Sequence, residues 1–171
     1  NVNDEKEYFT HFLERVDWKR DLHFQTKTTI DTLDYSGDGL NEGSKVVIAA
    51  AGEIKRTLSE KIDKINLPDN FSNPKLVSKG NLVIEGKGEI KELIIFLENN
   101  SLNGIGLITL VDDASFVIEN FANWLWVTFT RSNPANDIYG LDSKTSNKHF
   151  SCSIPIIDAR TKSHHAPILE R

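Results

Sequence analysis

Two adjacent carboxylates, Asp112 and Asp113, directly follow residues 105–111 (IGLITLV), an apolar run of strand length. Open α/β sheets bind ligands at the carboxyl ends of their parallel strands, and paired carboxylates at such an end could hold Mg²⁺. The alternative is that both side chains complement the dipole of a helix that begins immediately after them. We favour the capping role, because no further carboxylate or histidine lies close by in the sequence.

An acidic, glycine-containing segment, residues 34–45 (DYSGDGLNEGSK), is similar to a calcium-binding loop. Asp, Ser, Asp, Gly and Glu occupy loop positions 1, 3, 5, 6 and 9, but position 12, which should be a bidentate Glu, is Lys45. We therefore interpret the segment as an acidic turn. A phosphate-binding loop is also excluded, because Ser44 precedes Lys45 and the segment leads into a strand rather than a helix.

The chain offers two further sets of reactive side chains. Cys152 follows His149 by three residues, a spacing that would suit a thiol nucleophile, although a single cysteine is more often a small buried apolar residue. His164 and His165 are adjacent, so in an extended chain they would point to opposite faces and could not readily bind one metal ion. We expect a surface role for this pair. None of these sets is a complete catalytic constellation.

Composition restricts the class of protein. Lys and Arg number 20 and Asp and Glu number 25, so the net charge is −5, which does not favour binding to the phosphate backbone of a nucleic acid. Hydrophobic residues make up 39% of the 171 residues, as in a globular domain. A single cysteine excludes an internal disulfide and indicates a reducing, cytoplasmic location. No apolar run reaches the ~20 residues of a transmembrane segment.

The elements that position these residues follow from hydrophobic periodicity. We predict helices over residues 4–15, 53–62, around 90–97 and 116–130. We predict strands at 46–51, which we expect to be buried, and at 76–77, 82–84, 105–111 and 154–159. Residues 26–35 are expected to be irregular or weakly extended and residues 63–74 to form a loop. This alternation predicts one α/β domain over residues 1–171, with helices packed on a mixed or mostly parallel sheet.

The last third of the chain resembles the C-terminal domain of the UbiD-type decarboxylases, the polyprenyl-hydroxybenzoate carboxy-lyase family. The resemblance rests on residues 110–142, where a strand ends at Asp112 and Asp113, a helix containing Trp126 ends at Arg131, and Pro134 and Asp137 follow. Asp158, with Lys162 and Pro167 beyond it, resembles an Asp-Ala block near the end of family members. Residues 30–52 resemble a longer-chain branch of the family. The chain lacks Met, even at position 1, so we expect it to be a piece of a longer protein.

The resemblance implies non-oxidative removal of CO₂ from an aromatic or α,β-unsaturated acid in quinone biosynthesis, by prenylated FMN with Mn²⁺ and K⁺. It places the cofactor and the catalytic residues in an upstream flavin-binding domain, so we expect no catalytic, cofactor-binding or metal-binding residue in this chain. Arg131 and Asp137 are expected to be structural, with the arginine at a helix end and able to pair with a carboxylate such as Asp137. Asp112 is expected to hold the turn from strand to helix.

Three functions remain open at this point. The first is a structural or oligomerisation domain of a UbiD-like carboxy-lyase, inactive alone and part of a homo-oligomer. The second is a free-standing assembly module of the same fold. The third is a small metal-dependent hydrolase that uses Asp112 and Asp113. The aromatic residues Trp124, Trp126 and Phe129 exceed what a thin domain needs to bury, so we expect some of them to contact another domain or subunit.

Overall fold

The computed structural model describes residues 3–31, 34, 36, 37, 39 and 41–165. Asp38 of the acidic segment and Pro167 lie outside these residues, as does part of the stretch 26–35. The helices are α1 (Glu5–Arg15), α2 (Ile90–Glu98), α3 (Ala114–Glu119), α4 (Phe121–Thr130) and α5 (Pro134–Asp137). The strands are β1 (Leu22–Thr28), β2 (Gly43–Ile48), β3 (Phe71–Ser78), β4 (Asn81–Gly86), β5 (Leu107–Val111), β6 (Ile138–Gly140), β7 (Lys144–Ser146), β8 (His149–Ser151) and β9 (Pro155–Asp158).

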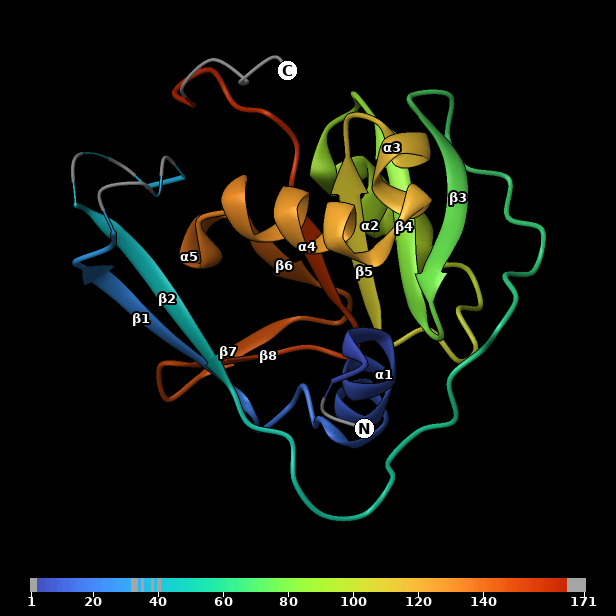
Figure 1. The fold of residues 1–171 in the computed structure, drawn as a ribbon, viewed down its shortest axis with the longest axis horizontal. Coiled ribbons are helices and arrows are strands. Elements are labelled where there is room, and N and C mark those ends of the chain that lie inside the picture. Colours follow the sequence, from blue (N-terminus) through green and yellow to red (C-terminus); the bar gives the residue numbers. More distant parts are fainter. Residues whose placement is uncertain (1–2, 32–33, 35, 38, 40, 166–171) are drawn as a thin grey trace.

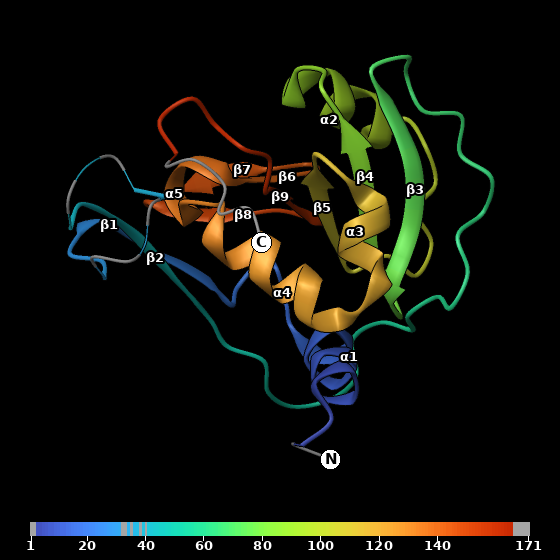
Figure 2. The same cartoon turned by 45° about the horizontal axis from the view of Figure 1, so that its top comes forward.

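A five-stranded sheet in the order β3-β4-β5-β9-β6 forms the centre of the molecule. β4, β5 and β9 run parallel to one another, and β3 and β6 are antiparallel to their neighbours at the two edges. Helix α2 covers one face of the sheet, while α1, α3 and α4 lie on the other (Figure 2). The predicted α/β fold with a mixed sheet is therefore confirmed.

The central strand β5 shows how the sequence specifies this layering. All five of its residues are buried, and they alternate between the two cores: Ile108 and Leu110 pack under α2, whereas Leu107 and Val111 pack under the helices of the other face. A strand covered on both faces appears as a continuous apolar run, which is the pattern that predicted it. The predicted helices at 4–15 and around 90–97 and the extended segment 154–159 are likewise confirmed as α1, α2 and β9.

The helix predicted over residues 53–62 does not form. This stretch instead wraps around the molecule as an irregular chain whose backbone groups bond to distant elements. Lys55 N–H donates to Glu14 O at the end of α1 (2.8 Å), and Ser59 N–H donates to Gly104 O (2.9 Å). Leu58 is buried against the backbone of the β3–β4 turn. These long-range contacts replace the helical hydrogen bonds, so tertiary packing overrides the local preference.

Three other boundaries differ from the prediction. The run 46–51 is not a buried strand: β2 ends at Ile48 and pairs only with β1, so Val47 is 53% exposed. The loop expected at 63–74 ends early, because β3 begins at Phe71 and accommodates Pro74 as an edge strand with a register shift. The single helix expected at 116–130 is two helices, broken at Asn120, whose side chain accepts the N–H of Asn123.

The hairpin of β1 and β2 stands apart from the main sheet (Figure 1). It contacts α5 and β8. Its side chains Leu22, Phe24 and Val46 also pack on the core that Leu107 and Ile157 of the main sheet help to form. Within the part of the chain that the structure describes, none of the helices is long and apolar enough to cross a membrane.

Candidate functional site: a polar centre at the ends of β5, β9 and α4

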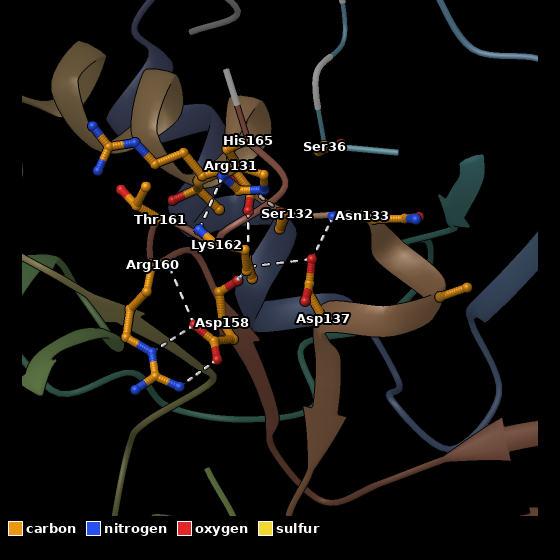
Figure 3. Close-up of polar contacts among 12 residues, drawn as sticks. Ser36, Arg131, Ser132, Asn133, Asp137, Asp158, Arg160, Thr161, Lys162 and His165 are labelled. Atoms are coloured by element: carbon orange, nitrogen blue, oxygen red, sulfur yellow. Dashed lines mark hydrogen bonds and ion pairs between the residues drawn. The ribbon is translucent and has the colours of Figure 1, made fainter. Parts of the chain in front are cut away.

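Five of the predicted residues meet at the carboxyl ends of the parallel strands. Asp112 follows β5, Asp158 ends β9, Arg131 is the C-cap of α4, and Pro134 and Asp137 are the first and last residues of α5. Figure 3 shows these elements converging on the segment that leaves β9. We call the group formed by Asp112, Arg131, Asn133, Asp137, Asp158, Arg160, Thr161 and Lys162 the polar centre.

Lys162 lies at the middle of the polar centre and contacts three of the elements (Figure 3). Its ammonium donates to Arg131 O (2.9 Å) and Asp158 O (2.5 Å), and it forms an ion pair with the carboxylate of Asp137 (3.2 Å). An ammonium has three N–H donors, and each of them has an acceptor here. Lys162 therefore ties together the ends of α4, α5 and β9, with no donor left for a ligand.

The carboxylate of Asp137 is buried, at 8% exposure. Besides Lys162, it accepts the backbone N–H of Asn133 (2.7 Å), which closes the first turn of α5. Burial raises the pKa of Asp137 above its ordinary value, and the nearby Lys162 ammonium opposes that increase without cancelling it. One cation and one backbone donor thus stabilise the charged form of this side chain against the effect of burial.

Asp158 and Arg160 form the second pair of the centre. The guanidinium of Arg160 contacts both carboxylate oxygens of Asp158, at 2.9 and 2.6 Å, and this hydrogen-bonded carboxylate raises the pKa of Arg160. Arg160 also donates to the carbonyl of Gly88 (2.7 Å), in the turn before α2. A bidentate arginine–carboxylate pair has a fixed geometry, so Arg160 is held where it links the end of β9 to the turn between β4 and α2.

The expected ion pair between Arg131 and Asp137 is not the one that forms. Arg131 pairs instead with Asp112 (3.4 Å), because the C-cap of α4 lies above the end of β5. The same carboxylate oxygen of Asp112 accepts both the N–H (2.8 Å) and the hydroxyl (3.0 Å) of Thr161. Asp112 therefore joins β5 to the segment after β9, whereas the turn into α3 is held by its neighbour.

That neighbour, Asp113, is the N-cap of α3 and accepts the N–H of Phe116 at 3.0 Å. This confirms the capping role proposed for it over metal binding. With both aspartates bonded to protein donors, the geometry does not favour the hydrolase hypothesis. In the described ranges, no group of three or more His, Cys, Asp or Glu side chains is placed to bind a metal ion.

The other candidate residues, Cys152 and the two adjacent histidines, do not form a reactive arrangement. Cys152 is 2% exposed, and burial raises the pKa of its thiol to about 12, as expected of a small core residue. His164 and His165 do not point to opposite faces, because the chain turns at Lys162 and brings the rings into edge-to-face contact at 4.7 Å. Burial lowers the pKa of His165, and its Nδ1 accepts the N–H of Lys162 (3.3 Å).

Trp126 lies outside the polar centre. It is on the outer side of α4 and 65% exposed, and Phe129 on the same helix is 56% exposed. Trp124 is fully buried, and its indole N–H donates to Thr109 in β5 (3.0 Å). Two of the three aromatic residues are therefore exposed and one is in the core, and the expected contact with another domain or subunit stays a prediction.

Sequence reasoning missed Asn133 and Ser44. The hydroxyl of Ser44 donates to the side-chain oxygen of Asn133 and accepts the N–H of Ala135 (2.8 Å), which attaches β2 to α5. Neither residue shows a pattern in the sequence. The only available signal is their position, because Asn133 precedes a proline at the start of a helix, where polar side chains commonly bond to free backbone groups.

A family model described as the 3-octaprenyl-4-hydroxybenzoate carboxy-lyase C-terminal domain matches residues 1–50. The chain is also similar to a Chlamydia pneumoniae protein that is named as a 4-hydroxybenzoate decarboxylase subunit, at 32% identity over 167 residues. That match covers 92% of this chain and 27% of the relative. An uncharacterized protein from Chlamydia trachomatis serovar D is 34% identical over 145 residues, covering 85% of this chain and 25% of the relative.

These similarities confirm the resemblance to a UbiD-type C-terminal domain, although the family model matches the first 50 residues rather than the last third of the chain. The relatives are similar over nearly the whole chain, so the likeness is not confined to either end. The chain spans about a quarter of the length of these relatives. No solved structure matches the chain.

Proposed function

We propose that this chain, a UbiD C-terminal-type domain, is the non-catalytic structural part of a carboxy-lyase. The whole protein would remove CO₂ from an aromatic or unsaturated acid of the polyprenyl-hydroxybenzoate type, in quinone biosynthesis in the cytoplasm. The observation that carries the proposal is the similarity, over 92% of the chain, to a protein named as a 4-hydroxybenzoate decarboxylase subunit. Because this match covers 27% of the relative, the proposal assigns the reaction to the remainder of the protein.

The chemistry of the polar centre supports a structural role. Lys162, Arg160 and the Oδ2 atom of Asp112 all bond to protein partners. These contacts join β5, β9, α4, α5 and the turn before α2 at the carboxyl ends of the parallel strands. A catalytic group needs a free donor, acceptor or proton within reach of a substrate. The proposed role of the centre is therefore to keep β5, β9, α4 and α5 in one rigid arrangement.

The proposal places prenylated FMN, Mn²⁺ and K⁺ in an upstream flavin-binding domain. Prenylated FMN, when bound, supplies the electron sink that decarboxylation needs and that amino-acid side chains lack. The carboxylates of the polar centre do not fit Mn²⁺, because Asp137, Asp158 and Asp112 already contact Lys162, Arg160 and Arg131. A divalent cation at this place would have to displace those cations.

The exposed side of α4 supports a contact with that domain or with a second subunit. Trp126 is 65% exposed and Phe129 is 56% exposed, and Tyr8 of α1, on the same face of the sheet, is 58% exposed. Large aromatic side chains are enriched at interfaces because they bury much apolar area with few rotatable bonds. We propose that this face is covered in the assembled enzyme, which would be a homo-oligomer.

The full-length natural protein that contains this chain provides the test. It should release CO₂ from 4-hydroxybenzoate when loaded with prenylated FMN, whereas residues 1–171 alone should bind no flavin. Trp126→Ser should reduce the assembled mass measured by light scattering and leave the melting temperature of residues 1–171 unchanged, because the side chain is on the surface. Ile95→Ser is the matched control, since Ile95 is 63% exposed on α2, across the sheet.

Three results would contradict the proposal: flavin binding by residues 1–171, an inactive loaded full-length protein, or equal effects of Trp126→Ser and Ile95→Ser on assembly. The alternative is a free-standing assembly module, which the same exposed aromatic face would also suit. The sequence encoded upstream of this chain in its gene distinguishes the carboxy-lyase from the assembly module. A flavin-binding domain encoded upstream supports the carboxy-lyase, and a start codon directly before Asn1 supports the module.

A further inference from the structure

A cavity of about 400 Å³ lies on the side of the sheet that carries α1 and α4. Its walls come from α1, the β1–β2 hairpin, α4 and the strands β5, β6 and β9. Aromatic rings make up much of the lining, among them those of Phe12, Trp18, Phe121 and Phe129. The cavity shares no residue with the polar centre, but Tyr8 and Phe129 of its lining also belong to the exposed face proposed above as a contact surface.

The lining is almost entirely apolar. Its only polar side chains are those of Glu5, Tyr8 and Trp18. The indole N–H of Trp18 donates to Gly106 O (2.8 Å), so it is not available to a ligand. Glu5 and Tyr8 stand in the first turn of α1 and are both exposed, which places them where the cavity meets solvent. The interior therefore presents hydrocarbon surface, and polar groups stand only at its mouth.

These features indicate which kind of ligand the cavity can bind. A polypeptide segment would carry backbone N–H and C=O groups into a space without partners for them, and leaving such groups unpaired is costly. A hydrocarbon chain has no such groups, and transferring it from water to an apolar cavity is favourable. The volume lies within the range of small-molecule sites, which run from roughly 300 to 1,000 Å³.

The polar residues at the mouth of the cavity favour one kind of head group on a bound hydrocarbon chain. The Glu5 carboxylate would repel an anionic head group, and the Tyr8 hydroxyl can both donate to and accept from a neutral one. We propose that the cavity between α1, the β1–β2 hairpin and α4 binds the hydrocarbon chain of a neutral single-chain lipid with a hydroxyl head group. This goes beyond the proposed structural role, although Tyr8 and Phe129 belong both to the cavity and to the face proposed above as a contact surface.

The test measures displacement of the fluorescent apolar probe N-phenyl-1-naphthylamine by 1-dodecanol and by dodecanoate, both below their aggregation limits. Dodecanol should displace the probe at a concentration roughly fivefold lower than dodecanoate, the size expected for one charge repulsion at a solvent-exposed mouth. Glu5→Gln should reduce this preference by improving displacement by dodecanoate. Glu5 is exposed, so this variant should fold normally.

Val46→Trp and Val47→Trp provide a matched pair on one strand. Val46 lines the cavity, whereas Val47 points away from it and is 53% exposed. Val46→Trp should abolish probe binding and Val47→Trp should preserve it, with circular dichroism confirming that both fold. Absence of dodecanol binding, equal binding by both Trp variants, or an alcohol preference that Glu5→Gln leaves unchanged would each overturn the proposal. If Val46→Trp does not fold, the effect of Glu5→Gln on displacement of the probe by dodecanoate tests the proposal on its own.

Discussion

At Asp137, burial and charge act in opposite directions on a single side chain. The carboxylate is 8% exposed, and burial raises its pKa even though Lys162 lies 3.2 Å away. An acid whose folded-state pKa is raised holds its proton more tightly in the folded than in the unfolded chain. Its contribution to stability is therefore present at low pH and is lost as the pH rises from 3.8 through the higher folded-state value.

This predicts a distinct pH dependence for Asp137→Asn. The amide keeps an oxygen that can accept the N–H of Asn133 but does not titrate. The free energy of unfolding of the variant, relative to wild type, should therefore rise as the pH increases from below 3.8 to about 7. Urea denaturation across that range measures the difference. A difference that stays constant, or that falls with pH, would show that burial does not dominate the electrostatics of this residue.

The ion pairs of the polar centre show that residue spacing in the sequence can predict which residues converge but not which of them pair. The spacing of Arg131, Pro134 and Asp137 identified residues that do converge. It could not identify their partners, because Lys162 and Asp112 come from other elements and reach the centre only when β5 and β9 lie side by side. Partner choice is a property of the tertiary fold, so the expected contact between Arg131 and Asp137 was wrong although both residues were chosen correctly.

At the scale of elements, Asn120 determines the direction of α4. It ends α3 and begins α4 with an extended backbone, and its side-chain oxygen accepts the N–H of Asn123 at 2.8 Å. The break lets α4 bury Trp124 while its opposite side stays exposed. The apolar run 116–130 predicted one helix because hydrophobic periodicity continues through the break, which is marked in the sequence by the polar residues Glu119 and Asn120.

We predict that Asn120→Ala lowers the free energy of unfolding by about 1 kcal/mol, the usual effect of losing an N-cap side chain. Chemical denaturation monitored by far-UV circular dichroism measures it. Asn103→Ala, an exposed position in the turn before β5, should change stability by less than about 0.5 kcal/mol. Equal effects of the two substitutions would mean that the cap does not hold the junction of α3 and α4.

The irregular chain around residues 53–62 shows where element prediction failed and why. Its local sequence suits a helix, but Lys55 and Ser59 give their backbone N–H groups to α1 and to the turn before β5. Those acceptors are distant in the sequence, so no local window contains them. Buried strands such as β5 were predictable for the opposite reason, because their own side chains carry the information.

For the whole molecule, the two cores on either side of β4, β5 and β9 contrast with the separate β1–β2 hairpin. Side chains of β5 pack into both cores, whereas the hairpin packs against one of them only, through Leu22 and the half-buried Phe24 and Val46 among others, and exposes Val47 at 53%. Protein regions with few buried contacts open locally, at a free energy well below that of global unfolding. We therefore expect the β1–β2 hairpin to open locally at a lower free energy than the global unfolding that exposes the main sheet.

Amide hydrogen exchange measured by NMR tests this expectation. The amides of Ile108 and Leu110 in β5 should exchange only through global unfolding, with an opening free energy equal to that obtained from denaturation. Those of Val46 and Phe24, which face one another in the β1–β2 hairpin, should exchange with a clearly lower opening free energy. Saturating the cavity with dodecanol should slow exchange at Leu110, because a ligand that binds only the folded state raises the free energy of global unfolding. It should slow exchange at Val46 by the same factor if opening of the hairpin removes Val46 from the cavity lining. Equal protection of hairpin and sheet without ligand would show one cooperative unit and contradict the division.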